Sequence, residues 1–198
     1  MSVQQSIFVR PRSVRHVADL ARAQFGHPSS DHLTYLNALN AYMRMKKEET
    51  KKEEATKGAG LDPKKWCMDH FLSYGILEEV LRIREQLARM LGKYGYDFTS
   101  AAFGTPDYEI KIRKALALSF FHQAAIKVSG EGTCKTIHHD VPALIHWDSM
   151  LAEGDIEWIV YNRFTFTGGK QYIQTITAIE PEWIMVCNST YSTISLLC

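Results

Sequence analysis

The chain has 198 residues, of which 45% are hydrophobic and 23% charged, and its formal net charge is +1. These values are typical of a globular protein of one or two compact domains and exclude a disordered chain. No run of 18 uncharged apolar residues occurs, and the apolar run in the opening MSVQQSIFVRPR is too short for a signal-peptide core. We therefore expect a soluble, intracellular protein that is neither secreted nor held in a membrane.

Charge is distributed unevenly along the chain. Residues 1–132 carry 20 Lys or Arg against 15 acidic residues, whereas residues 133–198 carry 3 against 7. Neither part has the strong basic excess of an autonomous nucleic-acid binder. The cysteines are Cys67, Cys134, Cys187 and Cys198. Their spacing matches neither a disulfide framework nor a zinc site, so we expect them to be reduced and partly buried.

The first predicted helix lies in SSDHLTYLNALNAYMRM. Ser30 or Asp31 is a suitable N-cap, and apolar residues recur at helical spacing as far as Met43. The run KKEETKKEEATKGAG follows, and over residues 46–60 it predicts a solvated helix extension and a charged linker. A basic arm that touches nucleic acid is the alternative interpretation of this run.

Three further helices are predicted before residue 130. DPKKWCMDHFL pairs a capping Asp62 with Pro63 at the first helical position. After Gly75, apolar residues repeat at spacings of three and four until Gly92, which predicts a long helix. TPDYEIKIRKALALSFFHQAAIKV begins with Thr105 as a cap and predicts a last helix. Four helices with short connections indicate a small bundle.

Beyond Gly130 the apolar period changes from 3.6 to 2. Four segments are typical of strands: CKTIHHDVPALIHW, EWIVYNRFTFT, KQYIQTITAI and EWIMVC. Gly168 and Gly169 supply positive φ at a hairpin turn. We therefore predict an α+β protein with a helical bundle over residues 1–130 and an OB-like antiparallel β-barrel over residues 131–198.

Common enzyme motifs are missing from the sequence. There is no GxxxxGK[ST], GxGxxG, HExxH or GxSxG, so we expect no catalytic residue and no bound ATP in this chain. His138, His139 and Asp140 are adjacent and could not converge on one ion without distant partners, so we expect a polar hairpin turn rather than a metal site. His122 is interpreted as a helix histidine rather than a base.

Four residues are candidates for contact with RNA. Lys135, Arg163, Lys170 and Tyr172 flank strand ends or the Gly-Gly hairpin. OB-like barrels bind single strands with such mixtures of cations and stacking aromatics, although a plain solvated edge would have the same composition. Regular alternation would place Tyr172 on one strand face with Gln174 and Ile176, and it does not say which face is interior.

Seven short segments, taken in order, resemble one family: the C-terminal helicase-associated region of DEAH-box RNA helicases. They are SVQQSIFVRP, HPSSDHLTYLNALNAY, WCMDHFL, IREQLARML, IRKALALSFFHQAA, EWIVYNRF and AIEPEWI. The resemblance extends over nearly the whole chain. It implies a ratchet-like helical domain and an OB-fold, with residues 1–12 as the end of a winged-helix domain.

The resemblance also implies a function. In that family the ratchet and OB-fold domains cover the RNA channel formed with two RecA-like motor domains, which bind ATP and Mg²⁺ and hydrolyse the nucleotide. We therefore expect an accessory module for RNA holding and translocation in nuclear pre-mRNA splicing or in ribosome assembly, with the cytoplasm as a second location. Its partners would be single-stranded RNA, bound weakly by this chain alone, and the motor domains. The alternative is a module that docks G-patch-type activators or splicing factors without holding RNA.

Overall fold

The structure is a computed structural model that describes residues 5–55, 62–96, 103–128, 132–152, 154 and 156–185. The chain forms two compact units. The first contains residues 1–26 and 34–100, and the second contains residues 27–33 and 101–198. Within the described ranges, no helix has the length and apolar character needed to cross a membrane. Cys67 and Cys134 are free and buried, whereas Cys187 and Cys198 lie outside the described residues.

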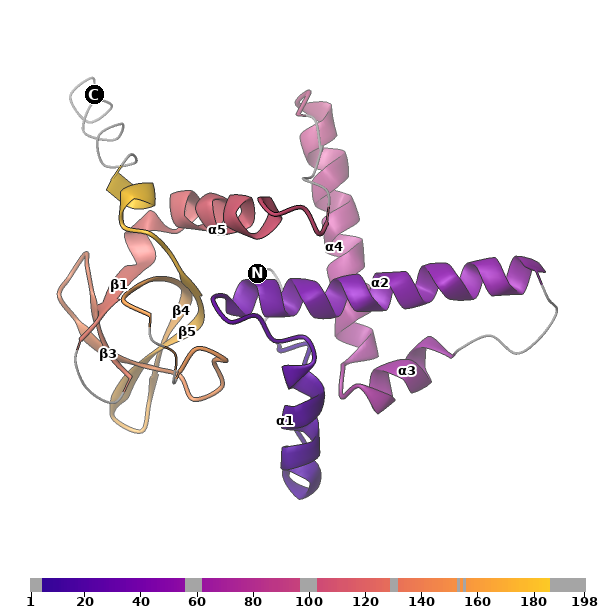
Figure 1. Cartoon of the computed structure of the whole chain (residues 1–198), viewed down its shortest axis with the longest axis horizontal. Coiled ribbons are helices and arrows are strands. Elements are labelled where there is room, and N and C mark those ends of the chain that lie inside the picture. The colour runs from indigo at the N-terminus through magenta and orange to yellow at the C-terminus, as the bar shows by residue number, and fades with distance from the viewer. Residues whose placement is uncertain are drawn as a thin grey trace. The chain divides into compact units, whose positions relative to one another are not determined.

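The first unit is helical (Figure 1). Its elements are η1 (Arg12–Val14), α1 (Arg15–Ala23), α2 (Asp31–Ala55), α3 (Pro63–Asp69) and α4 (Tyr74–Lys93). The first turn of α2, as far as residue 33, belongs to the second unit. The predicted start of α3 is confirmed, because the Asp62 side chain accepts a hydrogen bond from the Lys64 N–H and Pro63 occupies the first turn. Helix α1 was not predicted. Helix α2 continues through the first part of the charged run, whose residues 56–60 lie outside the described part.

The core of the first unit includes a buried tyrosine whose hydroxyl is paired. Tyr42 has no exposed surface, and its hydroxyl donates to Glu78 Oε1 over 2.6 Å. Lys46 Nζ donates to the same oxygen over 2.8 Å. These two hydrogen bonds lower the pKa of Glu78. Charge-assisted bonds of this kind let a tyrosine be buried without losing its hydrogen bond.

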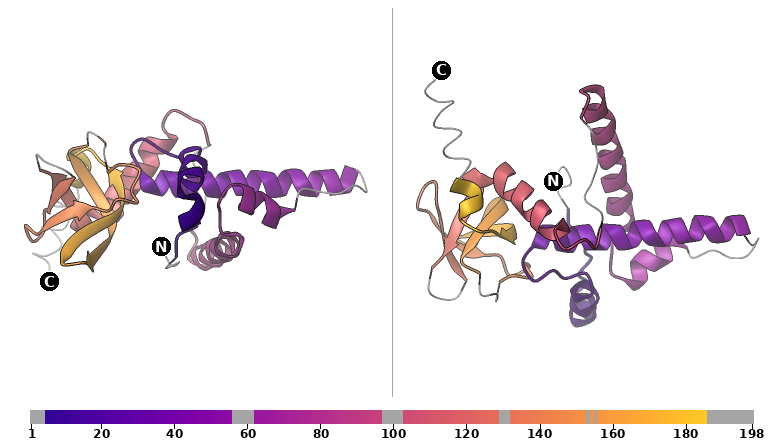
Figure 2. Two further views of the ribbon diagram at one scale, coloured as in Figure 1. Left: turned by 90° about the horizontal axis from the view of Figure 1, so that it is seen from below. Right: turned by 45° about the horizontal axis from the view of Figure 1, so that its top comes forward.

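The second unit is a closed five-stranded barrel accompanied by a helix, which Figures 1 and 2 show from three directions. Its elements are α5 (Tyr108–Ser119), η2 (Phe121–Gln123), β1 (Ala124–Lys127), β2 (Thr133–Thr136), β3 (Pro142–Ile145), β4 (Trp158–Thr167) and β5 (Lys170–Ala178). The strand order is β1-β2-β3-β5-β4, with β1 pairing β4 to close the ring. The predicted α+β class with an OB-like barrel is confirmed.

One strand pair of the barrel is parallel. β3 and β5 pair in parallel, whereas the other four pairs are antiparallel. Strand directions cannot alternate all the way around a ring with an odd number of strands, so a closed barrel of five strands needs one parallel pair. The expectation of a purely antiparallel barrel is corrected on this point.

The last predicted helix is shorter than expected at both ends. α5 begins at Tyr108 rather than directly after Thr105, and it ends at Ser119. The residues that follow form η2 and then β1, so the predicted boundary after residue 130 falls inside the second unit. Ala125 belongs to the barrel interior and Ala124 to the cluster between the barrel and α5. Because both faces of β1 are buried, its sequence has no alternation to distinguish it from helix.

The predicted strand EWIMVC is also wrong over its described part, since residues 182–185 are helical. Trp183 N donates to Glu180 O, and Ile184 N donates to Pro181 O. Proline favours the first turn of a helix, because its fixed φ suits that position. Trp183 and Ile184 pack in the cluster between α5 and the barrel, which explains the apolar pattern of the segment.

Strand β5 contains an irregular position, which we call the Thr175 kink. Thr175 has φ +54°, and the pairing with β4 omits both Thr175 and Asn162 between Arg163↔Gln174 and Tyr161↔Ile176, so the register is the same on either side. Ile173 and Ile176 are three residues apart and both face the barrel interior, which regular alternation would forbid. The predicted hairpin turn is confirmed, with positive φ at Gly168 and Gly169.

The Thr175 kink gives the first prediction. Thr175→Gly should raise the free energy of unfolding by about 0.5–1 kcal/mol, because a β-branched residue at positive φ is strained and the relief exceeds the entropic cost of glycine. Gln174→Gly is the matched control on the same strand and should lower it by about 0.5–1 kcal/mol. Urea unfolding of both variants measures the difference. Equal destabilisation by the two glycines would contradict a strained Thr175.

Candidate nucleic-acid interface

The register of the β4–β5 hairpin gathers three of the four predicted residues on one face. Opposite residues in an antiparallel pair point to the same side, and side chains alternate along each strand. The pairs Arg163↔Gln174, Thr165↔Tyr172 and Thr167↔Lys170 therefore share one face, which we call the outer hairpin face. It points away from the barrel interior, because the intervening Ile173 is fully buried there.

The Thr175 kink determines which residues accompany Tyr172. Regular alternation grouped Tyr172 with Gln174 and Ile176, but Ile176 lies inside the barrel. The positive φ at Thr175 interrupts the alternation, so Tyr172 shares its face with Gln174 but not with Ile176. The interior face, which the sequence did not identify, is the one that contains Ile173 and Ile176.

Lys135 lies apart from the outer hairpin face. It is exposed on β2, opposite Ile126 of β1 and Pro142 of β3. Its ammonium is 3.0 Å from the Asp140 carboxylate, which follows the predicted polar turn at His138 and His139. An exposed ion pair of this kind is weak, but it offsets part of the positive charge offered to a phosphate. Arg163 and Lys170 are exposed on the hairpin itself.

Two aromatic residues beside Tyr172, His146 and Trp147, were not identified as site residues from the sequence. His146 directly follows β3, and its N–H donates to Ile173 O over 3.0 Å. Its ring centroid is 5.7 Å from that of Tyr172 and 4.7 Å from that of Trp147, which is 60% exposed. Burial lowers the pKa of His146 below its usual value. The sequence signal for these residues was a Trp at the end of the apolar segment ALIHWD. That Trp was interpreted as part of the strand.

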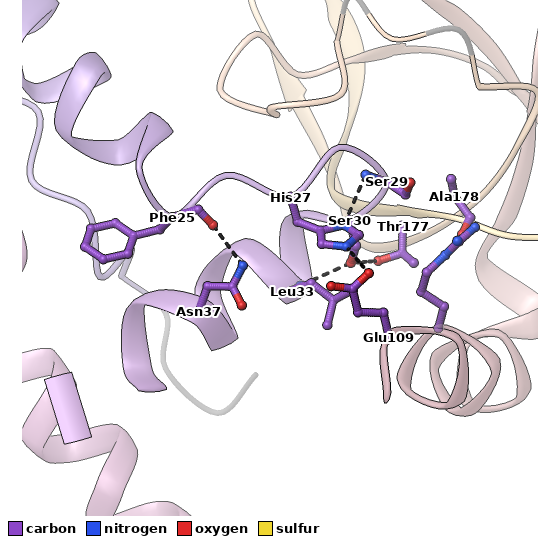
Figure 3. A network of polar contacts seen from close by, with 10 residues as sticks. Phe25, His27, Ser29, Ser30, Leu33, Asn37, Glu109, Thr177 and Ala178 are labelled. Carbon is purple, nitrogen blue, oxygen red and sulfur yellow. Dashed lines mark hydrogen bonds and ion pairs between the residues drawn. The ribbon is translucent and has the colours of Figure 1, made fainter. Parts of the chain in front are cut away.

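Residues 27–33 attach to strand β5 within the second unit, and we call them the anchor segment (Figure 3). Ala178 N donates to Ser29 O over 2.8 Å, and the Ser30 and Thr177 hydroxyls are 2.7 Å apart. Ser30 Oγ also accepts from Leu33 N over 3.1 Å, the geometry of an N-cap. Of the two predicted caps, Ser30 is therefore the one that serves α2.

His27 fixes the start of the anchor segment. Its Nδ1 accepts a hydrogen bond from Ser29 N over 3.1 Å, and its Nε2 is 3.0 Å from Glu109 Oε2 (Figure 3). Because Nδ1 accepts, Nε2 must carry the ring proton and donate to the carboxylate. Both ring nitrogens of this buried histidine are thus satisfied.

Asp31 is a buried carboxylate held by three donors. It is 2% exposed. One oxygen accepts from Met150 N over 3.0 Å, and the other accepts from Ser149 Oγ over 2.7 Å and from Ile176 N over 3.0 Å. Burying a charge without such partners would be costly, so the three bonds explain how an acidic residue is tolerated here.

His32 lies beside the same strand and is less well satisfied. Its Nδ1 is 2.8 Å from Thr177 Oγ1, and its ring lies 6.2 Å from that of Phe120. Its Nε2 is buried and has no hydrogen-bond partner among the described residues. Burial lowers the pKa of His32 to about 4, so the ring is neutral at pH 7.

The described part of the chain holds no group of three or more His, Cys, Asp or Glu side chains that could bind a metal ion. The buried thiols of Cys67 and Cys134 have pKa values raised to about 11 by burial, which is the opposite of nucleophile activation. The outer hairpin face and its neighbours bring cationic side chains and aromatic rings together at the barrel surface. Such an arrangement can bind a ligand through charge and stacking.

Sequence comparisons identify related proteins. Residues 112–191 match a family model described as an oligonucleotide/oligosaccharide-binding (OB)-fold. The chain is 28% identical over 186 residues to the pre-mRNA-splicing factor ATP-dependent RNA helicase prp22 of Schizosaccharomyces pombe. That alignment covers 94% of this chain but only 14% of the helicase. The predicted resemblance to the C-terminal helicase-associated region of DEAH-box RNA helicases is confirmed.

Asp31 gives the second prediction. Asp31→Asn keeps the shape of the side chain but replaces one accepting oxygen with an NH₂ group. One oxygen then remains for the three donors, and the NH₂ faces one of them. The free energy of unfolding should therefore fall by about 3 kcal/mol. Asp107→Asn is the control at a carboxylate whose side chain is 70% exposed, and it should change stability by less than about 0.5 kcal/mol. Equilibrium urea unfolding of both variants tests this. Equal stability of Asp31→Asn and the unsubstituted chain would refute it.

His32 gives a prediction about pH. Its folded-state pKa of about 4 lies below the ordinary value of 6.5, so the unfolded chain binds more protons between these values. Stability is therefore present above pH 6.5 and is lost as the pH falls, by about 2 kcal/mol between pH 7 and pH 5. His32→Gln should remove that part of the pH dependence. The exposed His122→Gln is the control and should retain the original slope, and identical slopes for the two variants would contradict the role of His32.

Proposed function

We propose that this chain is an accessory RNA-channel module of an ATP-dependent DEAH-box RNA helicase. The observation that carries the proposal is the outer hairpin face, where Arg163, Lys170 and Tyr172 lie together on the outside of a closed OB-type barrel. Cations neutralise phosphates and aromatic rings stack on bases, which is how OB-folds bind single strands. The match to an oligonucleotide/oligosaccharide-binding family model supports this choice of ligand.

The remaining parts of the proposal follow from the similarity to a helicase. ATP and Mg²⁺ would bind to motor domains outside this chain, and the module would hold RNA while those domains hydrolyse ATP. The prp22 relative is named as a pre-mRNA-splicing factor, which supports a role in nuclear splicing. RNA holding by this chain alone should be weak, because few cations face outward and residues 133–198 carry 3 basic against 7 acidic residues.

A second candidate function is docking of activator proteins or splicing factors without RNA contact. The acidic balance of residues 133–198 favours it, because negative charge repels phosphate and attracts basic peptides. The two functions differ in the role of the cations on the outer hairpin face. Only RNA holding requires them to face a polyanion.

The test is single-stranded RNA binding by fluorescence anisotropy over a salt series. Each phosphate contact contributes about 0.7 to the logarithmic salt slope, so the double variant Arg163→Glu/Lys170→Glu should bind more weakly and lose about 1.4 units of slope. The matched control Lys111→Glu/Lys114→Glu changes the net charge equally on exposed positions of α5 and should keep the original slope. Lys135→Glu, tested alone, should have a smaller effect because Asp140 already partners that lysine.

Two results would decide against RNA holding. Identical binding by the hairpin variant and the unsubstituted chain would remove these residues as RNA contacts and favour protein docking. Absence of saturable RNA binding by the unsubstituted chain at low salt would contradict the proposal directly, since electrostatic contacts are strongest under that condition.

A further inference from the structure

Three aromatic rings contact one another in succession outside the barrel. The centroid of the His146 ring is 4.7 Å from that of Trp147, with 33° between the ring planes, and 5.7 Å from that of Tyr172, with 82° between the planes. Tyr172 belongs to the outer hairpin face and Trp147 is 60% exposed. None of the three hydrophobic clusters of the described residues includes these rings. Packing of the core therefore does not account for an exposed tryptophan at this position.

Cations flank the rings on the outer hairpin face. The face consists of three rows, and Tyr172 occupies the middle row opposite Thr165. Arg163 lies in one neighbouring row and Lys170 in the other, each about 7 Å along the strands by β geometry. A strand whose base stacks on the aromatic surface would thus have a positive side chain on either side for its phosphates.

His146 contributes a ring without a charge. Asp148 N donates to its Nδ1 over 3.2 Å, so this nitrogen accepts and the ring keeps one orientation. Burial lowers its pKa, which keeps the ring neutral at pH 7. The ring can therefore support its neighbours sterically but adds nothing to the salt dependence of binding.

We propose that Trp147, with His146 and Tyr172, forms a base-stacking platform for single-stranded RNA beside the cations of the outer hairpin face. The inference rests on the proposed function and names the part of its site that reads bases rather than phosphates. Every base has a π-face, so such a platform binds without sequence preference. The cations in the flanking rows favour a polyanion over an apolar protein segment as the occupant of this surface.

The experiment compares two probes, a short fluorescent oligouridine and an abasic strand of the same length. Trp147→Ala should weaken oligouridine binding by about 5- to 150-fold, the effect of losing one stacked base. It should leave the salt slope and the binding of the abasic strand unchanged. Phe166→Ala is the matched control, because Phe166 is 70% exposed on β4 but points to the opposite face of the hairpin. It should bind both probes like the unsubstituted chain.

Thermal unfolding of each variant would first establish that it is folded. Trp147→Leu keeps apolar area without a ring and should show the same loss of oligouridine binding as Trp147→Ala. If Trp147→Ala retains oligouridine binding while Arg163→Glu/Lys170→Glu loses it, the platform is wrong and the proposed function stands. Equal weakening of both probes by Trp147→Ala would also overturn stacking. If the unsubstituted chain binds neither probe, the proposed function fails and the platform fails with it, which would favour a protein ligand.

Discussion

The hydrogen bonds to the Asp31 carboxylate connect two parts of the barrel that are distant in sequence. Ser149 and Met150 follow β3, whereas Ile176 directly follows the Thr175 kink in β5. The kink interrupts the pairing with β4, and a buried backbone N–H next to it still needs an acceptor. Asp31 supplies that acceptor to Ile176. The conformation of β5 at this point therefore depends on a residue of the anchor segment.

The Thr175 kink in turn decides which residues of β5 face outward. Regular alternation would place Ile173 and Ile176 on opposite faces of the strand. The positive φ at Thr175 allows both to face inward, so Tyr172 faces outward on one side of the kink and Thr177 reaches the anchor segment on the other. Structural hydrogen bonds and the candidate interface are thus consequences of the same local irregularity.

The sequence predicted those features that leave a local pattern. The N-cap at Ser30 or Asp31, the glycine turn at Gly168 and Gly169 and the barrel class each follow from residue types at short spacing. The Thr175 kink was not predictable, because Thr175 is β-branched and would ordinarily continue a strand rather than adopt positive φ. β1 was missed because both of its faces are buried. Trp147 was missed because its exposure depends on where β3 ends, which apolar periodicity does not define.

The proposed interface separates two kinds of recognition. Contacts from Arg163 and Lys170 to phosphates would depend on salt but carry no sequence information. Stacking on Trp147 and Tyr172 would be independent of salt, and it also tolerates any base. Neither contact discriminates between sequences, and the acidic balance of residues 133–198 weakens the contacts to phosphates. A module that holds RNA while a motor moves it needs contacts of this kind, because tight or base-specific binding would stop the strand at each preferred site.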